Sequence, residues 1–249
     1  MTNRTSIYFA SDLHLGAPNY EASIVREKLF VKWLDEIKND AEELYLVGDV
    51  YDFWFEYNTA IPKYFSRLHG KLAELTDSGI KIYFFSGNHD MWMFTYYKEE
   101  LNIEIIHQPI QITRQNKELY IGHGDGLGPG DKGYKFLKLF FRSSICQFLF
   151  SWIHPDIGMN IAQYWSRKSR LVNGAKDEIN HGEDEWLIQY TKRKLIEKHY
   201  DYFIFGHRHL PLDITLSEKS RYINLGDWIN YFTYAKLTDG KLSLLYYKK

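Results

Sequence analysis

Short, uninterrupted apolar runs recur along this chain, and they constrain its fold more than any other feature. Five of them occur, at residues 7–10, 44–47, 81–85, 119–121 and 202–205. A run without polar alternation is typical of a strand buried on both faces, as in parallel sheets covered by helices. Helical apolar spacing lies between several runs, at residues 22–38, 64–75 and 184–198. The alternation predicts an α/β layered fold.

The C-terminal part of the sequence has a different pattern. Short runs at residues 212–216, 221–225, 231–237 and 242–247 are separated by polar turns. This arrangement is typical of antiparallel strands. At 249 residues, with no internal repeat, the chain is long enough to bury a sizeable core.

Polar motifs stand directly after each of the five apolar runs. They are Asp12-Leu13-His14, Gly48-Asp49-Val50-Tyr51-Asp52, Gly87-Asn88-His89-Asp90, Gly122-His123-Gly124-Asp125 and Gly206-His207-Arg208-His209. Sites in open α/β sheets form beyond the carboxyl ends of the strands. We therefore expect all five motifs to converge in one crevice.

Aspartate, histidine and asparagine dominate these motifs, and their side chains are ligands that suit Mn²⁺, iron or Zn²⁺. Alternate residues of an extended segment share a side, so Asp12 with His14 and His207 with His209 can each present two ligands. Asp49 is the natural candidate for a carboxylate that bridges two metals. Two ions roughly 3.5–4 Å apart would activate a water and stabilise both oxygens of an in-line phosphoryl displacement.

Each motif taken alone also has an ordinary structural interpretation, as a turn or a hydrogen-bonded part of the core. Five of them after five apolar runs favour a functional site. Asp52, Asp90 and Asp125 keep a second interpretation, as residues that hold a turn, cap a helix or orient a neighbouring ligand. The histidines outside the motifs are expected to be structural or surface residues: His69, His107, His154, His181 and His199.

Residues 127–176 differ from the rest of the chain in charge and aromatic content. Eight basic and two acidic residues give this segment a charge of +6, whereas the whole chain carries −1. We interpret the segment as an inserted helical cap, basic on one face and aromatic on the other, with a helix over residues 134–153. Its aromatic residues Phe136, Phe140 and Phe148 would either pack the cap onto the core or line a groove for apolar chains.

The composition as a whole is that of an ordinary globular protein, with 45% hydrophobic and 25% charged residues. The near-neutral net charge gives no reason to expect nucleic acid as a partner, and no obligate protein partner is evident. A single cysteine, Cys146, cannot form an internal disulfide, which favours a reducing compartment. We expect no targeting or membrane-spanning segment, and a cytoplasmic protein or one that lies on a membrane surface.

The five motifs, in this order across residues 12–209, resemble those of the calcineurin-like metallophosphoesterases. The resemblance implies a four-layer α/β/β/α sandwich over residues 1–249, with the cap inserted in it, and two divalent metal ions, most commonly Mn²⁺. One ion would be held by Asp12, His14, Asp49 and His209, and the other by Asp49, Asn88, His123 and His207. His89 would be catalytic, protonating the leaving group or stabilising transition-state charge, and Asp90 would assist it.

Within that family, the chain is similar to the branch that hydrolyses UDP-2,3-diacylglucosamine to UMP and 2,3-diacylglucosamine 1-phosphate in lipid A synthesis. That branch carries a helical cap after its His-Gly-Asp motif. Its cap begins with an Asp and a Tyr, matched by Asp131 and Tyr134, and ends with a Ser-x-x-x-Asn-x-x-Lys run, matched by Ser169, Asn173 and Lys176. The resemblance implies that these five residues contact the substrate, together with Asn88, His89 and His207. It also implies a nucleotide-linked glycolipid substrate and peripheral contact with the inner membrane.

Two other functions remain open from the residues. The branch typically has Arg where this chain has His89, and His is the choice of the wider family. This difference favours a soluble phosphodiesterase or phosphatase that acts on nucleotides or small phosphate esters. A non-catalytic scaffold is disfavoured because all seven metal-ligand positions are filled. A nuclease is disfavoured because no basic stripe exists outside the cap.

Overall fold

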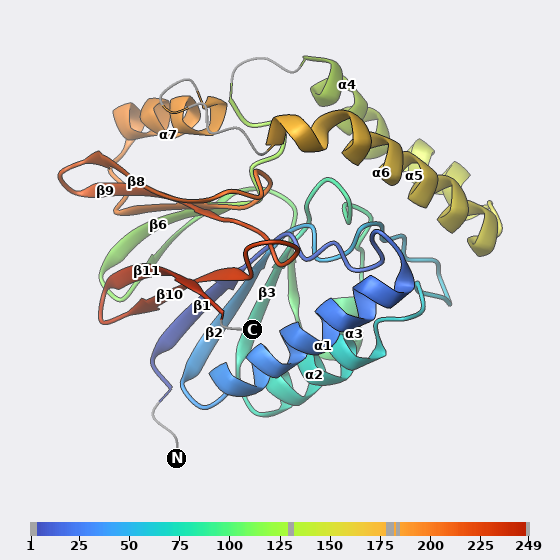
Figure 1. Cartoon of the computed structure of the whole chain (residues 1–249), viewed down its shortest axis with the longest axis horizontal. Helices are drawn as coiled ribbons and strands as arrows, with labels where there is room; N and C mark the ends of the chain where they lie inside the picture. Colours follow the sequence, from blue (N-terminus) through green and yellow to red (C-terminus); the bar gives the residue numbers. More distant parts are fainter. Residues whose placement is uncertain (1–3, 129–131, 178–181, 183–184, 248–249) are drawn as a thin grey trace.

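Two stacked β-sheets organise the molecule, which a computed structural model describes over residues 4–128, 132–177, 182 and 185–247 (Figure 1). The first sheet has six strands in the order β11-β10-β1-β2-β3-β4. Their bounds are β1 Ser6–Ala10, β2 Ala41–Val47, β3 Lys81–Phe85, β4 Glu104–Ile106, β10 Thr233–Thr238 and β11 Lys241–Tyr246. Strands β1 to β4 run parallel, whereas β10 returns antiparallel beside β1.

The second sheet has five strands in the order β5-β6-β7-β9-β8. Their bounds are β5 Ile110–Arg114, β6 Lys117–Gly122, β7 Tyr202–Phe205, β8 Pro211–Ser217 and β9 Ser220–Leu225. The three inner strands run parallel to one another, and the two edge strands are antiparallel to their neighbours. The carboxyl ends of β6 and β7 therefore lie at one edge of this sheet.

Helices cover the outer face of each sheet, and apolar side chains fill the three spaces between the layers. Helices α1 Tyr20–Ile37, α2 Ser66–Asp77 and α3 Tyr96–Leu101 lie on the first sheet, and α7 Trp186–Glu197 lies on the second (Figure 1). One apolar cluster joins α1 and α2 to the first sheet, a second lies between the sheets, and a third joins α7 to the second sheet. The predicted four-layer α/β/β/α sandwich is confirmed.

The five uninterrupted apolar runs are β1, β2, β3, β6 and β7. The expected helices and the four C-terminal strands are also present, with bounds shifted by a few residues. The sequence analysis missed α3, β4 and β5. Strand β4 has three residues, and β5 is an edge strand whose residues alternate in exposure, so neither forms a continuous apolar run.

Three helices, α4 Lys132–Phe141, α5 Ser144–Ser151 and α6 Pro155–Asp177, form the cap that extends over the edge of the sheets (Figure 1). The single helix expected over residues 134–153 is wrong, because the chain breaks between α4 and α5. Ser143 is extended there, and its hydroxyl caps α5 by accepting from the Cys146 amide. The indole of Trp92 donates to the Phe141 carbonyl at the end of α4, 2.7 Å away.

Lys135 and Lys138 of α4, with Arg142 just after it, are directed to the core, whereas most of the large apolar side chains of α4 are exposed. Lys135, Lys138 and Arg142 donate to core carbonyl groups at 2.6, 2.9 and 3.1 Å. The large apolar side chains that are exposed on α4 and α5 are Phe136, Leu137, Leu139, Phe140, Ile145, Phe148, Leu149 and Trp152. Of the two interpretations of Phe136, Phe140 and Phe148, packing onto the core is therefore wrong, and a groove for apolar chains stays a prediction.

Two other cap residues make that contact with the core. The rings of Phe141 and Phe150 lie against Trp92, with centroids 5.8 and 4.8 Å away. Phe150 also contacts Phe53 and Phe55. Within the described ranges, none of the helices combines the length and the apolar character that crossing a bilayer requires.

Candidate active site

The five polar motifs stand directly after the carboxyl ends of β1, β2, β3, β6 and β7, three strands of the first sheet and two of the second. The parallel registers of β1, β2 and β3 bring the first three motifs together. The amide of Gly206 donates to the carbonyl of His123 at 3.0 Å, which joins the last two. Their side chains meet in three overlapping groups of metal-binding type: Asp12, His14, His209; His14, Asp49, His89; and Asp49, His123, His207.

Five of the candidate ligands have a left-handed backbone, which non-glycine residues rarely adopt. Their φ angles are 55° at Asp12, 45° at His14, 51° at Asp49, 69° at His207 and 55° at His209. Such conformations cost about 1–3 kcal/mol each and persist only where the surroundings hold them. Here the Asp12 and His14 amides donate to the carbonyls of Gly48 and Asp49, at 3.1 and 2.9 Å. All five of these residues contribute side chains to the shared ligand groups.

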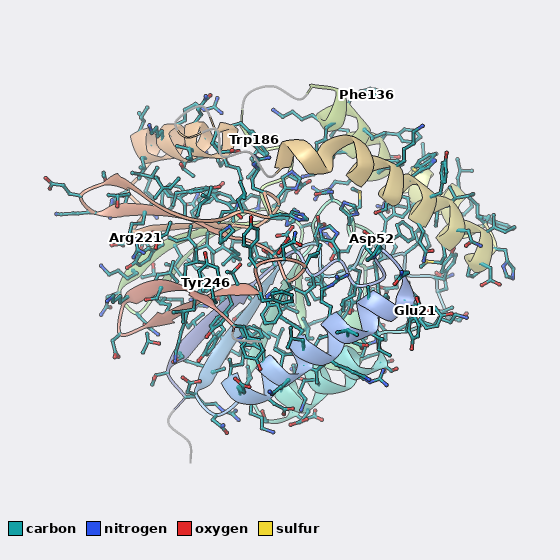
Figure 2. The ribbon with its side chains drawn as sticks, in the orientation of Figure 1. Glu21, Asp52, Phe136, Trp186, Arg221 and Tyr246 are labelled. Carbon is teal, nitrogen blue, oxygen red and sulfur yellow. The ribbon has the colours of Figure 1, made fainter. Side chains whose placement is uncertain are left out.

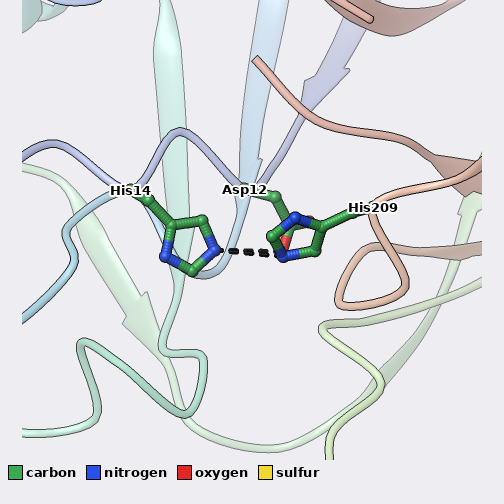
Figure 3. A group of neighbouring side chains, drawn as sticks. All are labelled: Asp12, His14 and His209. Atoms are coloured by element: carbon green, nitrogen blue, oxygen red, sulfur yellow. Dashed lines mark hydrogen bonds and ion pairs between the residues drawn. The ribbon is translucent and has the colours of Figure 1, made fainter. Parts of the chain in front are cut away.

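The first ligand group consists of Asp12, His14 and His209 (Figure 3). The Nε2 atoms of the two imidazoles are 3.2 Å apart, and Asp12 Oδ1 is 3.4 Å from His209 Nε2. The other oxygen of Asp12 accepts from the His207 amide at 2.9 Å. One carboxylate oxygen and two ring nitrogens thus point at the same place.

A second group, which shares no residue with the first, consists of Asp49, His123 and His207, and Asn88 lies beside it. Asp49 Oδ2 is 3.2 Å from His123 Nε2 and 3.8 Å from His14 Nε2, so it lies between the two groups. The amide oxygen of Asn88 is 3.3 Å from His123 Nε2. This placement supports Asp49 as the bridge between two metals.

In the ligand cluster, the negative charge of the Asp49 carboxylate is offset by a proton on a neighbouring imidazole. Burial opposes the charged form of Asp49, but the neighbouring imidazoles of His123, His89 and His14 together outweigh it and hold the pKa of the Asp49 carboxyl well below its usual range. Burial likewise opposes protonation of His123, yet Asp49 raises the pKa of that imidazole to about 10. A bound cation would take the place of this proton.

Divalent metals fit these residues. The buried Oδ1 of Asp12 has no hydrogen-bond partner among the described residues. The Nδ1 atoms of three histidines face oxygens outside the cluster: His123 donates to the Val47 carbonyl at 2.8 Å, His14 lies 3.5 Å from Asp52, and His209 lies 3.6 Å from Asp227. Oxygens in these positions favour the tautomer that leaves Nε2 free to bind a metal.

A comparison with known proteins agrees with this geometry. The family model for the calcineurin-like phosphoesterases matches residues 5–211. The chain belongs to this family. It is a metal-dependent phosphoesterase, as the motifs predicted, and its two sheets with their covering helices have the fold of the family.

Several curated relatives of this phosphoesterase cover almost the whole chain. It is 36% identical over 246 residues to the UDP-2,3-diacylglucosamine hydrolase of Porphyromonas gingivalis, which covers 93% of this chain and 94% of that protein. The protein of the same name from Haemophilus influenzae is 28% identical over 240 residues, with the same coverage. Among solved structures, the phosphoesterase Yfce of E. coli is 17% identical with a TM-score of 0.46, covering 97% and 93% of the two chains.

His89 lies beside the first group of ligands in this phosphoesterase. Its ring meets the His14 ring edge-on at 4.7 Å, and its side chain is 14% exposed. Its Nδ1 is 3.0 Å from the carbonyl oxygen of Asp52, which accepts the ring proton. Burial lowers the pKa of His89 to about 4.

Asp90 is fully buried and organises the backbone of the second motif. Its carboxylate accepts from the amides of Asp49, Val50, Tyr51 and Gly87, at 2.7–3.3 Å. Burial, with Asp49 nearby, raises the pKa of Asp90 to about 7. The helix after this motif, α3, has Thr95 as its N-terminal flanking residue, so Asp90 does not cap it.

The cap contacts the site through two side chains of the core. Asp125 accepts from the Tyr134 hydroxyl at 2.6 Å and pairs with Lys138 at 2.5 Å. Asp52 accepts from the Ser166 hydroxyl of α6 at 2.9 Å. Asp52 and Asp125 thus contact both the cap and the surroundings of the ligands, in agreement with their second interpretation as residues that orient a neighbouring ligand.

Four of the substrate contacts expected from the resemblance lie outside the described part of the structure, wholly or in their side chains. Asp131 lies outside the described residues. Ser169, Asn173 and Lys176 are on α6, and their side chains are outside the described part. Of that set, Tyr134 is placed beside the fourth motif, while Asn88, His89 and His207 lie in the ligand cluster.

The sequence analysis missed four residues that bear on the site. Asp227 lies behind His209, and Trp186 meets the His207 ring edge-on at 5.8 Å. Arg208 forms a buried ion pair with Glu185 at 3.0 Å, and Ser166 contacts Asp52. Asp227 had a signal, because Gly226-Asp227 follows the run 221–225 just as Gly48-Asp49 follows its own run. Arg208 stands inside the fifth motif but is not of a metal-ligand type, and Trp186 and Ser166 stand in no such pattern.

The remaining histidines lie away from the metal-ligand cluster. His69 bonds to the hydroxyls of Tyr51 and Tyr97, and His107 to that of Ser86. His154 and His199 are on the surface. These four are structural or surface residues, as expected, and His181 lies outside the described residues.

Proposed function

We propose that this phosphoesterase hydrolyses the pyrophosphate bond of UDP-2,3-diacylglucosamine, releasing UMP and 2,3-diacylglucosamine 1-phosphate. The observation that carries the proposal is the 36% identity to a protein named for that substrate, over nearly the full length of both chains. The cap adds independent support. Its exposed apolar side chains beside a phosphoester site suit a substrate with acyl chains, because soluble proteins rarely expose a continuous apolar surface of this kind.

We propose two divalent ions, most commonly Mn²⁺, at the two ligand groups. Asp12, His14, Asp49 and His209 would hold one, and Asp49, Asn88, His123 and His207 would hold the other. When bound, the ions activate water and neutralise charge on the phosphoryl oxygens. The chain's own residues fix where these charges act, because the strained backbone and the outer oxygens orient each ligand.

His89 is proposed to assist the departing phosphate. Hydrolysis forms a new phosphorus–oxygen bond to water and breaks the bond to the bridging oxygen, which needs a proton or a hydrogen bond as it leaves. With Nδ1 donating to the Asp52 carbonyl, Nε2 can supply either only when the ring is doubly protonated, a form that the negative charge of a bound pyrophosphate would favour. Asp90 is proposed to act as a positioning residue, because it holds the loop that presents Asp49.

The outward apolar side of α4 and α5 is proposed to contact the cytoplasmic face of the inner membrane. A lipid substrate resides in such a membrane, and a peripheral contact would let the sugar phosphate reach the site. Exposed aromatic and aliphatic side chains are the groups that enter the boundary between headgroups and acyl chains.

A second function is favoured by His89. Because His is the residue of the wider family at this position, a soluble nucleotide or small phosphate ester is the competing substrate. The experiment compares kcat/KM for the lipid-linked nucleotide in mixed micelles with kcat/KM for bis(p-nitrophenyl) phosphate. Lipid turnover that is much the more efficient supports the proposal, and efficient turnover of the small ester with none of the lipid overturns it.

A cap variant makes that comparison sharper. Asn173→Ala with Lys176→Ala removes two expected contacts to the lipid phosphate. We expect the ratio of kcat/KM for lipid over small ester to fall by about tenfold or more, since each charge-assisted hydrogen bond contributes about 1.5–3 kcal/mol. Lys168→Ala, at an exposed position of the same helix, is the matched control and should leave the ratio unchanged. An unchanged ratio in the double variant contradicts the lipid assignment.

A further inference from the structure

Helix α6 approaches the core through a line of small residues. Gly158, Ala162 and Ser166 recur at every fourth position, so they lie on one face of the helix, and all three are buried. A Cβ on Gly158 would press against the Tyr57 hydroxyl and the Phe150 ring. Small side chains therefore let this helix lie close to the core, and Ser166 is the member of the line that has a polar group.

The Ser166 hydroxyl lies between two residues of different motifs. It donates to the Asp52 carboxylate at 2.9 Å, and its oxygen is 3.2 Å from Nδ1 of His89. The proton of the hydroxyl is used on the carboxylate, so towards His89 the oxygen acts as an acceptor. This contact joins the cap to the candidate catalytic histidine, whereas the metal ligands come from the core.

Three oxygens then surround Nδ1 of His89. The Asp52 carbonyl is 3.0 Å away, Ser166 Oγ is 3.2 Å away, and the Asp52 carboxylate is 3.7 Å away. All of them favour a proton on Nδ1, and together they restrict rotation of the ring. A ring held in this way presents Nε2 in one direction, which is what a group that acts on a leaving oxygen requires.

We propose that Ser166 is a positioning residue for His89, so that the inserted cap tunes the chemical step as well as substrate binding. The inference rests on the proposed function, in which His89 assists the leaving group. It deepens that function, because α6 also carries Ser169, Asn173 and Lys176, the expected contacts to the lipid phosphate. A substrate that shifts α6 when it binds would therefore also shift Ser166, and with it the position of the His89 ring.

The test is a double-mutant cycle on the metal-loaded enzyme, with bis(p-nitrophenyl) phosphate as substrate. This small ester does not require the lipid contacts, so it reports the chemistry alone. Ser166→Ala should lower kcat about tenfold with little change in KM, metal content or melting temperature, because one hydrogen bond is lost. Ser166→Thr keeps the hydroxyl and should restore most of kcat. Ser151→Ala, an exposed serine of α5, is the matched control and should have no effect.

The second arm of the cycle separates positioning from a general structural role. In the His89→Ala background, Ser166→Ala should have no further effect on kcat, since the ring on which it acts is gone. An equal loss in both backgrounds overturns the proposal, and so does an unchanged kcat in Ser166→Ala. If His89→Ala alone retains full kcat, the catalytic assignment of His89 fails first. If His89→Ala lowers kcat and Ser166→Ala leaves kcat unchanged, the assignment of His89 stands and this inference fails.

Discussion

Asp49 belongs to two of the three ligand groups, and it lies next to His14 of the third. One of its carboxylate oxygens accepts from the His89 amide at 2.8 Å, and the other lies between His14 and His123. The backbone of Asp49 is left-handed, and its own amide donates to the Asp90 carboxylate. In the proposed two-metal arrangement, a substitution here would change the charge shared by both metals, whereas a change at any other ligand would act mainly on one.

The first prediction concerns this bridge. Asp49→Ala should abolish turnover and weaken both metal sites, because the shared carboxylate offsets charge from two cations. Metal content by plasma emission spectroscopy, together with anomalous scattering from crystals, measures the effect. His209→Ala is the comparison, and it should weaken the first site more than the second. Two fully occupied sites in Asp49→Ala would contradict the bridging role.

A second prediction concerns the close approach of Gly87 to Asp49. A Cβ on Gly87 would overlap the Asp49 carboxylate and its backbone nitrogen. Gly87→Ala should therefore displace the bridging carboxylate and lower kcat by at least about tenfold, with loss of metal. Gly133→Ala is the control, because nothing lies within 4 Å of a Cβ there. That variant should keep activity and gain slightly in stability, since Ala favours helix over Gly.

At the scale of elements, α4 and α5 lie with their apolar sides outward. An amphipathic helix on a core normally turns its apolar side inward. Here Lys135 donates to the Gly128 carbonyl, and Lys138 binds the carbonyl and the carboxylate of Asp125. Phe141 and Phe150 make the apolar contact with Trp92. The exposed apolar side is therefore available to a lipid.

The third prediction tests that availability. Phe148→Ser with Trp152→Ser removes two side chains that are 60% and 78% exposed, so the melting temperature should change little. Co-sedimentation with vesicles that contain anionic lipid should fall several-fold, because each buried aromatic side chain contributes about 1.5–3 kcal/mol to apolar transfer. Ile196→Ser is the control, since Ile196 is 86% exposed on α7, outside the cap. Equal vesicle binding by all three proteins would contradict the membrane contact.

At the scale of the whole molecule, three apolar layers and a few buried polar groups determine stability. His69 of α2 is half-buried, and its ring packs against Tyr51, Trp54 and Tyr97 between the first sheet and its helices. Burial lowers its pKa from an ordinary 6.5 to about 4. The folded protein therefore keeps His69 neutral over a range of pH in which the unfolded chain binds a proton.

The fourth prediction follows from that difference. Above pH 6.5 the imidazole is neutral in both states, so it contributes no pH dependence to the free energy of unfolding. As the pH falls from 6.5 towards 4, only the unfolded chain gains the proton, and stability is lost. One unit of pKa difference corresponds to about 1.4 kcal/mol, so the loss approaches about 3 kcal/mol near pH 4.

His69→Gln isolates this contribution from the carboxylates, which also titrate in this range. The variant should be less stable than the parent at pH 7.5, because the Tyr51 and Tyr97 contacts are optimised for imidazole. Its free energy of unfolding should nevertheless fall less between pH 6.5 and 4. Urea denaturation across that range measures both curves, and parallel curves would contradict the assignment.

The sequence by itself determined the parallel strands and the candidate metal ligands. Burial on both faces leaves a continuous apolar run such as residues 81–85, and the turn after it carries its ligands within a few residues. The apolar run and the ligand residues after it are both local features of the sequence, so they can be recognised without knowing the fold. The family and its metal-dependent chemistry followed from the same motifs.

Other features were decided only by tertiary contacts. Nothing in residues 233–246 shows that β10 and β11 return to the first sheet while β8 and β9 stay in the second. The period of the α4 pattern predicts an amphipathic helix, but Trp92, Asp125 and the His107 carbonyl decide which side faces inward. Ser166 reaches His89 across 77 residues of sequence because small side chains let α6 lie close to the core. Contacts between distant segments leave no periodic mark on either one, and for that physical reason only the folded chain reveals them.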